Sequence, residues 1–554
     1  MMKFPRSWLF TVLLPFLLVA VPAPGQVTVQ IGQNFTGSTY GVNSQGLPPD
    51  PNGVIGPTRF MEFVNGAVAV YNRTNGVSVQ RKSDIKFWSD AGLIISPNSA
   101  VSDPRVIYDP TVQRWFATQV DFDANATDPT TEANDFLLAV STTSNPTGPW
   151  KGFLFQADPD NGYFADFPTL GVDSNAVYIS GDFFSSSVAV GPGLLSIPKA
   201  DLIAATPTIA NLTWYGVMDY TVRGDVLQPA VCFDGSATGS ILAMGDIGSD
   251  SSPHSNVVWF AVQNAGGTNA TLSASASLTV APYEVPDNDI LGVPQFTALQ
   301  PDGTTTLQAN DPRLAAKVFA VGGVLYAVHN TELNGHIAIR WYRIRAADHT
   351  LLEQGTIADP NLDLFFPCIA ANLYGVVMIC CDGSGANTFI SNYAYAGQTV
   401  NGHTTFGSGI LLQSGVVSYH DLNEVLAQLV DDPPTTSRWG DYSTLSVDPL
   451  DPTQFWTIQM YPSGDDPNLG TGIWSTQITQ LTATTPPQLA ITPSGTNVLV
   501  AWPLYAASYQ LFSTASLNPP ATWASVTQPT VTNGLQISVT LPHPGTKKFY
   551  RLQK

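Results

Sequence analysis

A set of polar residues recurs at or next to one repeated position in the chain, and their types suit the recognition or cleavage of a sugar. They are Asp50, Asp103, Arg105, Asp166, Arg313, Arg438, Asp441 and Tyr442. Arginine holds carboxylates through paired hydrogen bonds, and two carboxyl groups that flank a glycosidic bond can cleave it. Because only 12% of all residues are charged, Arg and Asp at equivalent positions are candidates for one shared site.

These residues lie within or next to the copies of a short sequence repeat. It has a Pro or small residue, an apolar residue two places on, and an Asp or Asn five places on. Copies lie at residues 103–109, 166–173, 228–234, 366–372 and 438–448, with looser copies from residues 50 and 311. Pro suits the first residue of a strand, and Asp suits the turn that follows, where its side chain bonds the local backbone.

The spacing of the repeat predicts the fold class. Copies begin near residues 50, 103, 166, 228, 311, 366 and 440, which leaves room for four strands each. The runs between them are short, β-branched and aromatic, and are bounded by Gly, Pro and Asp. An all-β fold follows, a β-propeller of about seven four-stranded blades. The inner strand of each blade begins near one central mouth, so we expect the polar residues to line a shared funnel.

The rest of the chain divides into four parts. Residues 1–25 are typical of a signal peptide, with Lys3 and Arg6 before an apolar run and a small-residue cleavage site. We expect the propeller over 26–481, with a strand from 27–47 closing the ring against the last blade. Residues 482–487 are a linker by composition, and 488–554 form a C-terminal β-sandwich-like module. No later run approaches the length of a membrane span, so we expect a secreted or cell-surface protein without a transmembrane segment in the mature chain.

Composition excludes some partners. The net charge is −20 and apolar residues make up 44% of the chain, so a large core is available and the surface repels phosphate backbones. Nucleic acid is therefore excluded as a partner. The acidity by itself needs no explanation beyond solubility.

Several motifs together resemble a family of secreted bacterial proteins. They are PPDPNGVIGP at 48–57, DPRVIYD at 103–109, RW at 114–115, PTGPW at 146–150 and RWGDYS at 438–443. The resemblance covers most of residues 48–480 and implies a sialidase-like propeller architecture. The ending KKFYRL at 547–552 is similar to a small β domain of exported bacterial proteins, which implies attachment to the cell surface.

A sialidase-like activity would assign roles to the polar set. Tyr442, Asp441 and Asp103 are then the candidate catalytic residues, and Arg105, Arg313, Arg438, Asp50 and Asp166 bind the substrate. Glu332 or Glu424 would assist the Tyr nucleophile, and Asp50 or Asp103 would be the acid. The Ser-x-Asp-x-Gly-x-Thr-Trp motif of sialidases is missing from the sequence. Alternatively, each Asp caps its own blade turn and each Arg pairs with a neighbouring Asp.

Other residues support weaker hypotheses. His329 and His420 are candidate bases for a polysaccharide lyase, although a structural role is the simpler interpretation. The loops at 121–125 and 158–162 carry alternating oxygen ligands, as calcium loops do, but lack the terminal Glu. We expect no cofactor, with structural calcium as an alternative. Cys368 faces Cys380 across a predicted hairpin, and buried thiols are favoured over a disulfide.

The sequence therefore predicts an exported propeller that binds a glycan or another extracellular polymer in its central funnel, without an evident catalytic set. A sialidase-like glycoside hydrolase or a polysaccharide lyase is the first alternative. A structural or protein-binding surface propeller is the second.

Overall fold

The computed structural model describes residues 27–245, 253–286, 289–290, 293–304, 307–422, 424–425, 436–467 and 470–554. The predicted signal peptide at 1–25 lies outside the described residues. Strands dominate, and the helices α1 (Asp84–Asp90), α2 (Lys199–Leu202) and α3 (Tyr220–Arg223) are short. Within the described ranges, no helix combines the length and apolar character that crossing a bilayer requires.

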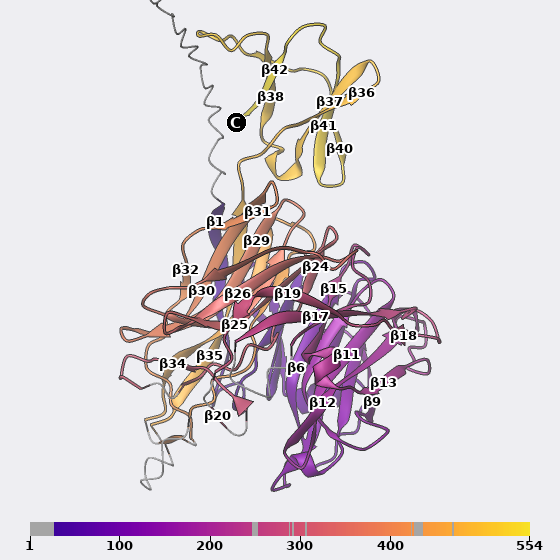
Figure 1. The fold of residues 1–554 in the computed structure, drawn as a ribbon, viewed down its shortest axis with the longest axis vertical. Coiled ribbons are helices and arrows are strands. Elements are labelled where there is room, and N and C mark those ends of the chain that lie inside the picture. Colours follow the sequence, from indigo (N-terminus) through magenta and orange to yellow (C-terminus); the bar gives the residue numbers. More distant parts are fainter. Residues whose placement is uncertain are drawn as a thin grey trace, which may run out of the picture.

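Seven sheets of the described chain follow one another as blades (Figure 1). Blades 1 to 3 are β2 (Asn52–Ile55), β3 (Arg59–Val64), β4 (Ala67–Asn72) and β5 (Ser78–Lys82); β6 (Ser99–Asp109), β7 (Arg114–Asp123), β8 (Asp135–Ser141) and β9 (Trp150–Gln156); and β10 (Phe164–Val172), β11 (Ala176–Ser185), β12 (Val188–Pro198) and β13 (Thr213–Val217). Blade 4 is β14 (Asp225–Pro229), β16 (Ser240–Met244), β17 (His254–Gln263), β18 (Thr271–Leu272) and β19 (Ala276–Tyr283).

Blade 5 is β24 (Phe319–Val321), β25 (Val324–Leu333), β26 (His336–Arg345) and β27 (Leu351–Ile357), joined by β15 (Val231–Cys232) from the blade before it. Blade 6 is β28 (Asp363–Ala371), β29 (Val376–Gly385), β30 (Thr388–Val400), β31 (His403–Phe406) and β32 (Ile410–Gln413). Blade 7 is β33 (Thr444–Val447), β34 (Gln454–Asp465), β35 (Gly472–Thr484) and β1 (Thr28–Thr39). The short pairs β20 (Asp289–Ile290) with β21 (Val293–Pro294), and β22 (Thr297–Ala298) with β23 (Leu307–Gln308), lie between blades 4 and 5 in the chain.

The inner strands close a ring. Strand β2 contacts β6, β6 contacts β10, and the series continues through β14, β15, β24 and β28 to β33, which contacts β2 again. The predicted seven-bladed propeller is thus confirmed. Strand β1, from the N-terminal side of blade 1, pairs antiparallel with β35 of blade 7, as expected for the closing strand. Both ends of the propeller chain therefore meet in one sheet, which fastens the ring.

The C-terminal residues form two further sheets with a core of their own. One sheet is β36 (Ala490–Ser494), β37 (Asn497–Pro503), β41 (Gln536–Pro542) and β40 (Val531–Asn533), and the other is β39 (Ala524–Ser525), β38 (Gln510–Thr514) and β42 (Phe549–Gln553). Their inward side chains include Val500, Trp502 and Val539. The predicted small β-sandwich is confirmed. Figure 1 shows it at the top of the molecule, where Tyr505 packs edge-on against Tyr374 of blade 6 at 4.9 Å.

A left-handed residue marks the inner strand of every blade. These residues are Asp50, Asp103, Phe167, Val226, Asn310, Phe366 and Gly440, with φ between 46° and 153°. In β6, β10, β14 and β28 the pairing register skips at this place, which is a β-bulge. In these four strands the bulge changes the direction of the side chains at the start of the strand. In blade 4 Pro229 ends β14, so the bulge there precedes the sequence repeat.

The Asp or Asn that recurs at the same place in each copy of the repeat has the predicted role in a turn. Asp109, Asp173, Asp234, Asn372 and Asp448 each accept the backbone N–H two residues further on, at 2.6 to 3.0 Å. Each turn therefore replaces a lost backbone partner with a side-chain oxygen.

The second side-chain atom of the same residues joins each blade to the next. Asp109 accepts from Lys199 at 2.7 Å, Asp173 from the Gly239 N–H at 2.6 Å, and Asp234 from the Gly322 N–H at 2.7 Å. Asn372 donates to the Pro452 carbonyl at 2.7 Å, and Asp448 pairs with Arg73 of blade 1. The repeat thus specifies the contact between blades as well as the turn within one.

The four cysteines all lie in described strands and are buried free thiols. Cys368 and Cys380 are direct cross-strand partners, as the hairpin predicted. The Cys368 thiol lies 3.5 Å from the Cys380 carbonyl oxygen, to which it donates. The cysteines therefore act as small apolar core residues.

Candidate functional site

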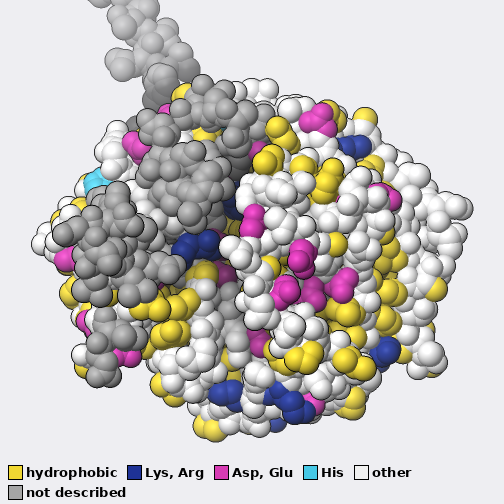
Figure 2. Space-filling view, turned by 90° about the horizontal axis from the view of Figure 1, so that it is seen from below, with side chains coloured by type: hydrophobic (Ala, Val, Ile, Leu, Met, Phe, Trp, Pro, Cys, Tyr) yellow, Lys and Arg dark blue, Asp and Glu magenta, His cyan; other side chains and the backbone are white. Residues whose placement is uncertain are grey.

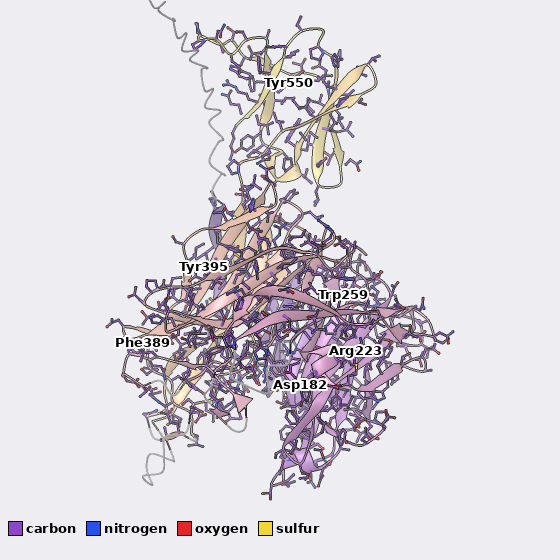
Figure 3. All side chains as sticks on the ribbon, viewed as in Figure 1. Asp182, Arg223, Trp259, Phe389, Tyr395 and Tyr550 are labelled. Atoms are coloured by element: carbon purple, nitrogen blue, oxygen red, sulfur yellow. The ribbon has the colours of Figure 1, made fainter. Side chains whose placement is uncertain are left out.

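The bulged starts of the inner strands surround a polar mouth on the ring axis. Figure 2 shows this face, which lies away from the C-terminal module, with Asp, Glu, Lys and Arg side chains around the hollow at its centre. Asp182, labelled in Figure 3, lies in the half of the propeller away from the module. The residues at this mouth form an outer layer that reaches solvent and a buried inner layer.

The outer layer consists of charged side chains from three blades. They are Asp166 and Asp182 from blade 3, Arg313 from the segment before β24, and Arg438 and Asp441 from the segment before β33; we call them the mouth charges. Asp166 is exposed, and 40% of the Arg438 side chain is accessible. Asp182, Asp441 and Arg313 are partly accessible. Carboxylates and guanidinium groups thus lie together at this mouth.

Both solvent-reaching arginines are already paired with carboxylates. Arg313 donates from Nε and Nη2 to the two oxygens of Asp311, at 2.8 and 2.6 Å, and its Nη1 lies 3.9 Å from Asp182. Arg438 donates from Nη2 to Asp441 at 3.1 Å. The Asp441 charge, followed by that of Asp50, raises the pKa of Arg438 above its ordinary value. The alternative in which each Arg pairs with a neighbouring Asp is therefore what these two residues do.

Two of the mouth carboxyls, those of Asp166 and Asp182, have raised pKa values. Removal from water raises the pKa of Asp182 to about 8, against the opposing charge of Arg313. Partial desolvation by the surrounding blades also raises the pKa of Asp166, although the Phe167 N–H donates to it at 2.8 Å. Groups whose pKa is shifted in a concave site are candidates for function.

One of the mouth charges, Asp441, converges with the buried Asp50 and Asp103. One carboxylate oxygen from each lies within 4.8 Å of the others. Burial raises the pKa of Asp103 to about 7, and burial followed by the Asp441 charge raises that of Asp50 well above its ordinary value. Asn65 bridges the cluster: it donates to Asp50 at 2.8 Å and accepts the Asp103 N–H at 2.9 Å. Oxygen ligands in this number suit a hard cation, although each carboxylate here also has a protein partner.

Tyr442 and Arg105 form the floor of the mouth. The Tyr442 hydroxyl donates to Asp103 at 2.5 Å, and the Arg105 guanidinium carbon lies 3.4 Å from the centre of the Tyr442 ring. Arg105 donates to the carbonyls of Pro168 at 2.6 Å and Ala315 at 3.3 Å. Tyr442 has no accessible surface, and Arg105 has 2%. This stack ties blades 2, 3, 5 and 7 together across the axis.

The floor does not have the properties of a sialidase nucleophile. Burial and the Asp103 charge raise the pKa of Tyr442 well above its ordinary value, so the hydroxyl stays protonated and acts as a donor. Its partner is Asp103; Glu424 instead contacts His420 at 2.9 Å and also bonds Ser437. Glu332 is exposed near the end of β25. The predicted residues are therefore brought together, but Tyr442 and Arg105 lie below the surface that a substrate would touch.

The two candidate histidines have structural partners. His329 is buried, with its ring nitrogens 2.6 Å from the Asn330 carbonyl oxygen and 2.9 Å from the Tyr342 hydroxyl, and burial lowers its pKa to about 3. Hydrogen bonding to Glu424, and then to Asp302 at 2.6 Å, raises the pKa of His420 to about 9. Neither is a base poised near neutral pH.

The two acidic loops use their carboxylates within the fold. Asp158 is buried and accepts the N–H groups of Asp160 and Tyr163, at 3.1 and 3.2 Å. Asp121 accepts the Asp135 N–H at 2.8 Å. These bonds are those of self-capped turns, so neither loop stands out as a calcium site.

Sequence reasoning missed Asp182 and Asn65. Asp182 faces Asp166 directly across strands β10 and β11, so the cross-strand register of blade 3 would have identified it. Asn65 follows β3 in blade 1, outside the repeat, and only its contacts reveal its role as the bridge between two inner strands.

Comparison with known proteins yields solved structures only. No family model and no curated protein matches the chain. Drosophila Semaphorin 1b, extracellular domains 1–2, is 7% identical over 82% of this chain and 87% of that one, with a TM-score of 0.33. Trypanosoma rangeli sialidase is 9% identical, with coverage of 82% and 84% and a TM-score of 0.33. A protein of unknown function from Dyadobacter fermentans DSM 18053 is 8% identical, with coverage of 81% and 97% and a TM-score of 0.34. Likeness at this level says nothing about ligand or activity.

Proposed function

We propose that the protein is an exported β-propeller that binds a glycan in the polar mouth without turning it over. The observation that supports this most is the presence of both carboxylates and guanidinium groups that reach solvent among the mouth charges. Sugar hydroxyls both donate and accept, so adjacent hydroxyls match adjacent donors and acceptors of this kind. Concave sites with a few convergent polar groups are the usual places of ligand binding.

The preferred ligand is a neutral sugar or an amino sugar. Three of the mouth charges are carboxylates and two are guanidinium groups, and Asp50 and Asp103 lie directly beneath them. Arg313 and Arg438 are already engaged by Asp311 and Asp441. A sialic or uronic acid would therefore find no unengaged guanidinium group for its carboxylate, and each ionised mouth carboxylate would repel it.

Secretion, with attachment of the protein to the cell surface through the C-terminal module, is part of the same proposal. It is supported by the signal-like residues 1–25 and by the resemblance of residues 547–552 to a surface-sorting domain. The module contacts the propeller at Tyr374, in the turn that joins β28 to β29. That turn lies at the end of the inner strands away from the polar mouth, so an attached protein would present its mouth outward.

The test is a glycan array probed with the mature protein, its Arg438→Ala variant and an Arg345→Ala control. Arg345 and Asp348 form the same i,i+3 pair as Arg438 and Asp441, but in an outer turn of blade 5. We expect neutral or amino glycans to be retained by the wild type and the control, and at least tenfold weaker signals with Arg438→Ala. Retention of sialosides alone would contradict the charge argument. Binding of no glycan would favour the protein-binding alternative.

One observation favours hydrolysis as a second candidate function. Asp182 keeps its proton near neutral pH, since burial raises its pKa to about 8, and its side chain reaches the mouth opposite Asp166. A carboxyl that keeps its proton near neutral pH can serve as the general acid of a glycoside hydrolase, with the facing carboxyl of Asp166 as the second member of the pair. Release of reducing sugar from an array hit, abolished by Asp182→Asn, would replace the binding-only proposal with this one.

A further inference from the structure

A second site lies on the ring axis at the end opposite the polar mouth. A cavity of about 180 Å³ opens there. Apolar side chains from six inner strands line it, namely Val54, Ile107, Val231, Phe319, Ile369 and Leu445. At its rim, Leu373 is 61% exposed, so the cavity communicates with solvent. Its neighbour Tyr374 carries the contact to the C-terminal module.

Four polar residues of the described chain also line the cavity, namely Asn372, Ser446, Asp448 and the one cation, Lys317. Lys317 donates from Nζ to the Val106 carbonyl at 2.6 Å and to the Asn52 side-chain oxygen at 3.3 Å. A protonated amine has three donors, so one N–H remains. Asn52 has no accessible surface, and its side-chain nitrogen has no hydrogen-bond partner. The cavity thus holds one Lys317 N–H that no hydrogen bond in the described part of the protein uses.

Two cations, Lys317 and Arg105, have no counter-charge within the described parts of the chain. Neither Lys317 nor Arg105 forms an ion pair among the described residues, although Asp and Glu outnumber Lys and Arg by 42 to 22 in the chain. Arg105 is 2% exposed, and its Nη2 has no partner. Burial and the Arg105 charge lower the pKa of Lys317 to about 7. Unpaired buried charge is costly, and an anion would offset that cost.

We propose that this axial cavity binds a small apolar monocarboxylate, with its hydrocarbon body against the inner strands and its carboxylate on Lys317 Nζ. The volume of the cavity limits the size of the ligand, because a cavity of about 150 Å³ accommodates benzene. A ring-bearing or branched acid of about six to eight carbon atoms fits on the same scale. None of the mouth charges takes part, so this site is independent of the proposed glycan binding.

The test titrates the mature protein with benzoate and with benzyl alcohol, which has the same body without the charge. Two variants accompany the wild type. Lys317→Met keeps the volume and removes the cation, and Ala371→Leu fills the cavity that Ala371 lines. Lys151→Met, an exposed lysine beside Phe153 on β9, is the control.

We expect saturable benzoate binding to the wild type and to Lys151→Met, at least tenfold weaker in Lys317→Met and in Ala371→Leu. Benzyl alcohol should bind Lys317→Met as well as the wild type. At pH 8, binding should take up a proton, measurable by calorimetry in buffers of different ionisation enthalpy, because the bound carboxylate recharges the Lys317 amine. Equal benzoate affinity in Lys317→Met, or no saturable binding of benzoate to the wild type, would overturn the proposal.

Discussion

Replacing Asp103 by Asn should stabilise the protein at pH 8. Asp103 is 6% exposed, and its carboxyl lies within 4.8 Å of those of Asp50 and Asp441. Burial raises its pKa from 3.8 to about 7. Asn keeps the size of the side chain and tolerates the left-handed backbone, φ 61°, at this position. The substitution therefore removes the charge and little else.

That the substitution increases stability, and does so at pH 8, follows from proton linkage. The folded state keeps a proton on Asp103 that the unfolded chain loses above pH 3.8, so stability falls as pH rises from about 4 to about 7. A pKa difference of this size corresponds to roughly 4 kcal/mol at pH 8. Asn bonds Tyr442 and Ser102 less strongly than a carboxylate does, and charge-assisted bonds are worth about 1 kcal/mol more than neutral ones. We expect a net gain of about 2 kcal/mol at pH 8 and little change at pH 4.

Asp109→Asn is the matched control. It lies in the same strand, β6, and is fully buried, but its carboxylate pairs with Lys199 at 2.7 Å. Removing that charge leaves a buried, unpaired ammonium, which costs about 3 to 5 kcal/mol. Urea unfolding followed by tryptophan fluorescence at pH 4 and pH 8 measures both variants. If Asp103→Asn destabilises the protein at pH 8 as Asp109→Asn does, the electrostatic description of the mouth is refuted.

Three further predictions concern the ring. Glu62→Ala should lower the free energy of unfolding by about 3 kcal/mol and expose β1 to proteolysis. The reason is that buried Glu62 accepts from the Ser38 N–H of β1 at 3.0 Å and from the Tyr71 hydroxyl of β4 at 2.6 Å. Unchanged cleavage of β1 would contradict this prediction. Asp448→Ala should lower the free energy of unfolding in urea by about 3 kcal/mol, because it removes both a turn bond and the ion pair of blade 7 with Arg73. A decrease below about 1 kcal/mol would show that Asp448 does not join blade 7 to blade 1. The four thiols should resist an aqueous thiol reagent until the protein is denatured, since all are buried, and rapid labelling of the native state would show that description to be wrong.

The blade repeat could be predicted because its chemistry is local. Asp109, Asp173 and Asp448 each bond the backbone two residues on, and this interaction leaves a fixed spacing in the sequence. Blade count and the closing strand follow from the period and from the strand-like run before the first copy. The bonds that Asp109 and Asp448 make to the next blade leave no such spacing, because their partners Lys199 and Arg73 lie far away in the chain.

The depth of each site residue could not be predicted. Tyr442 and Arg438 are four residues apart, yet Tyr442 has no accessible surface and 40% of the Arg438 side chain is accessible. Gly440, with φ 153°, lies between them. Sequence position alone placed both in the funnel, whereas their roles depend on how deeply each side chain is buried. Asp182 was missed because it belongs to a second strand, and the repeat marks only inner strands.

The central claim is that the mouth charges bind a glycan, and calorimetric titration of the best array ligand into Asp166→Ala tests it most directly. Asp166 is the exposed member of the set, and its loss should leave folding intact. Asp348→Ala, which removes an exposed carboxylate from an outer turn, is the control. We expect at least a tenfold loss of affinity for Asp166→Ala and none for Asp348→Ala. Equal affinity in the wild type and Asp166→Ala would contradict it.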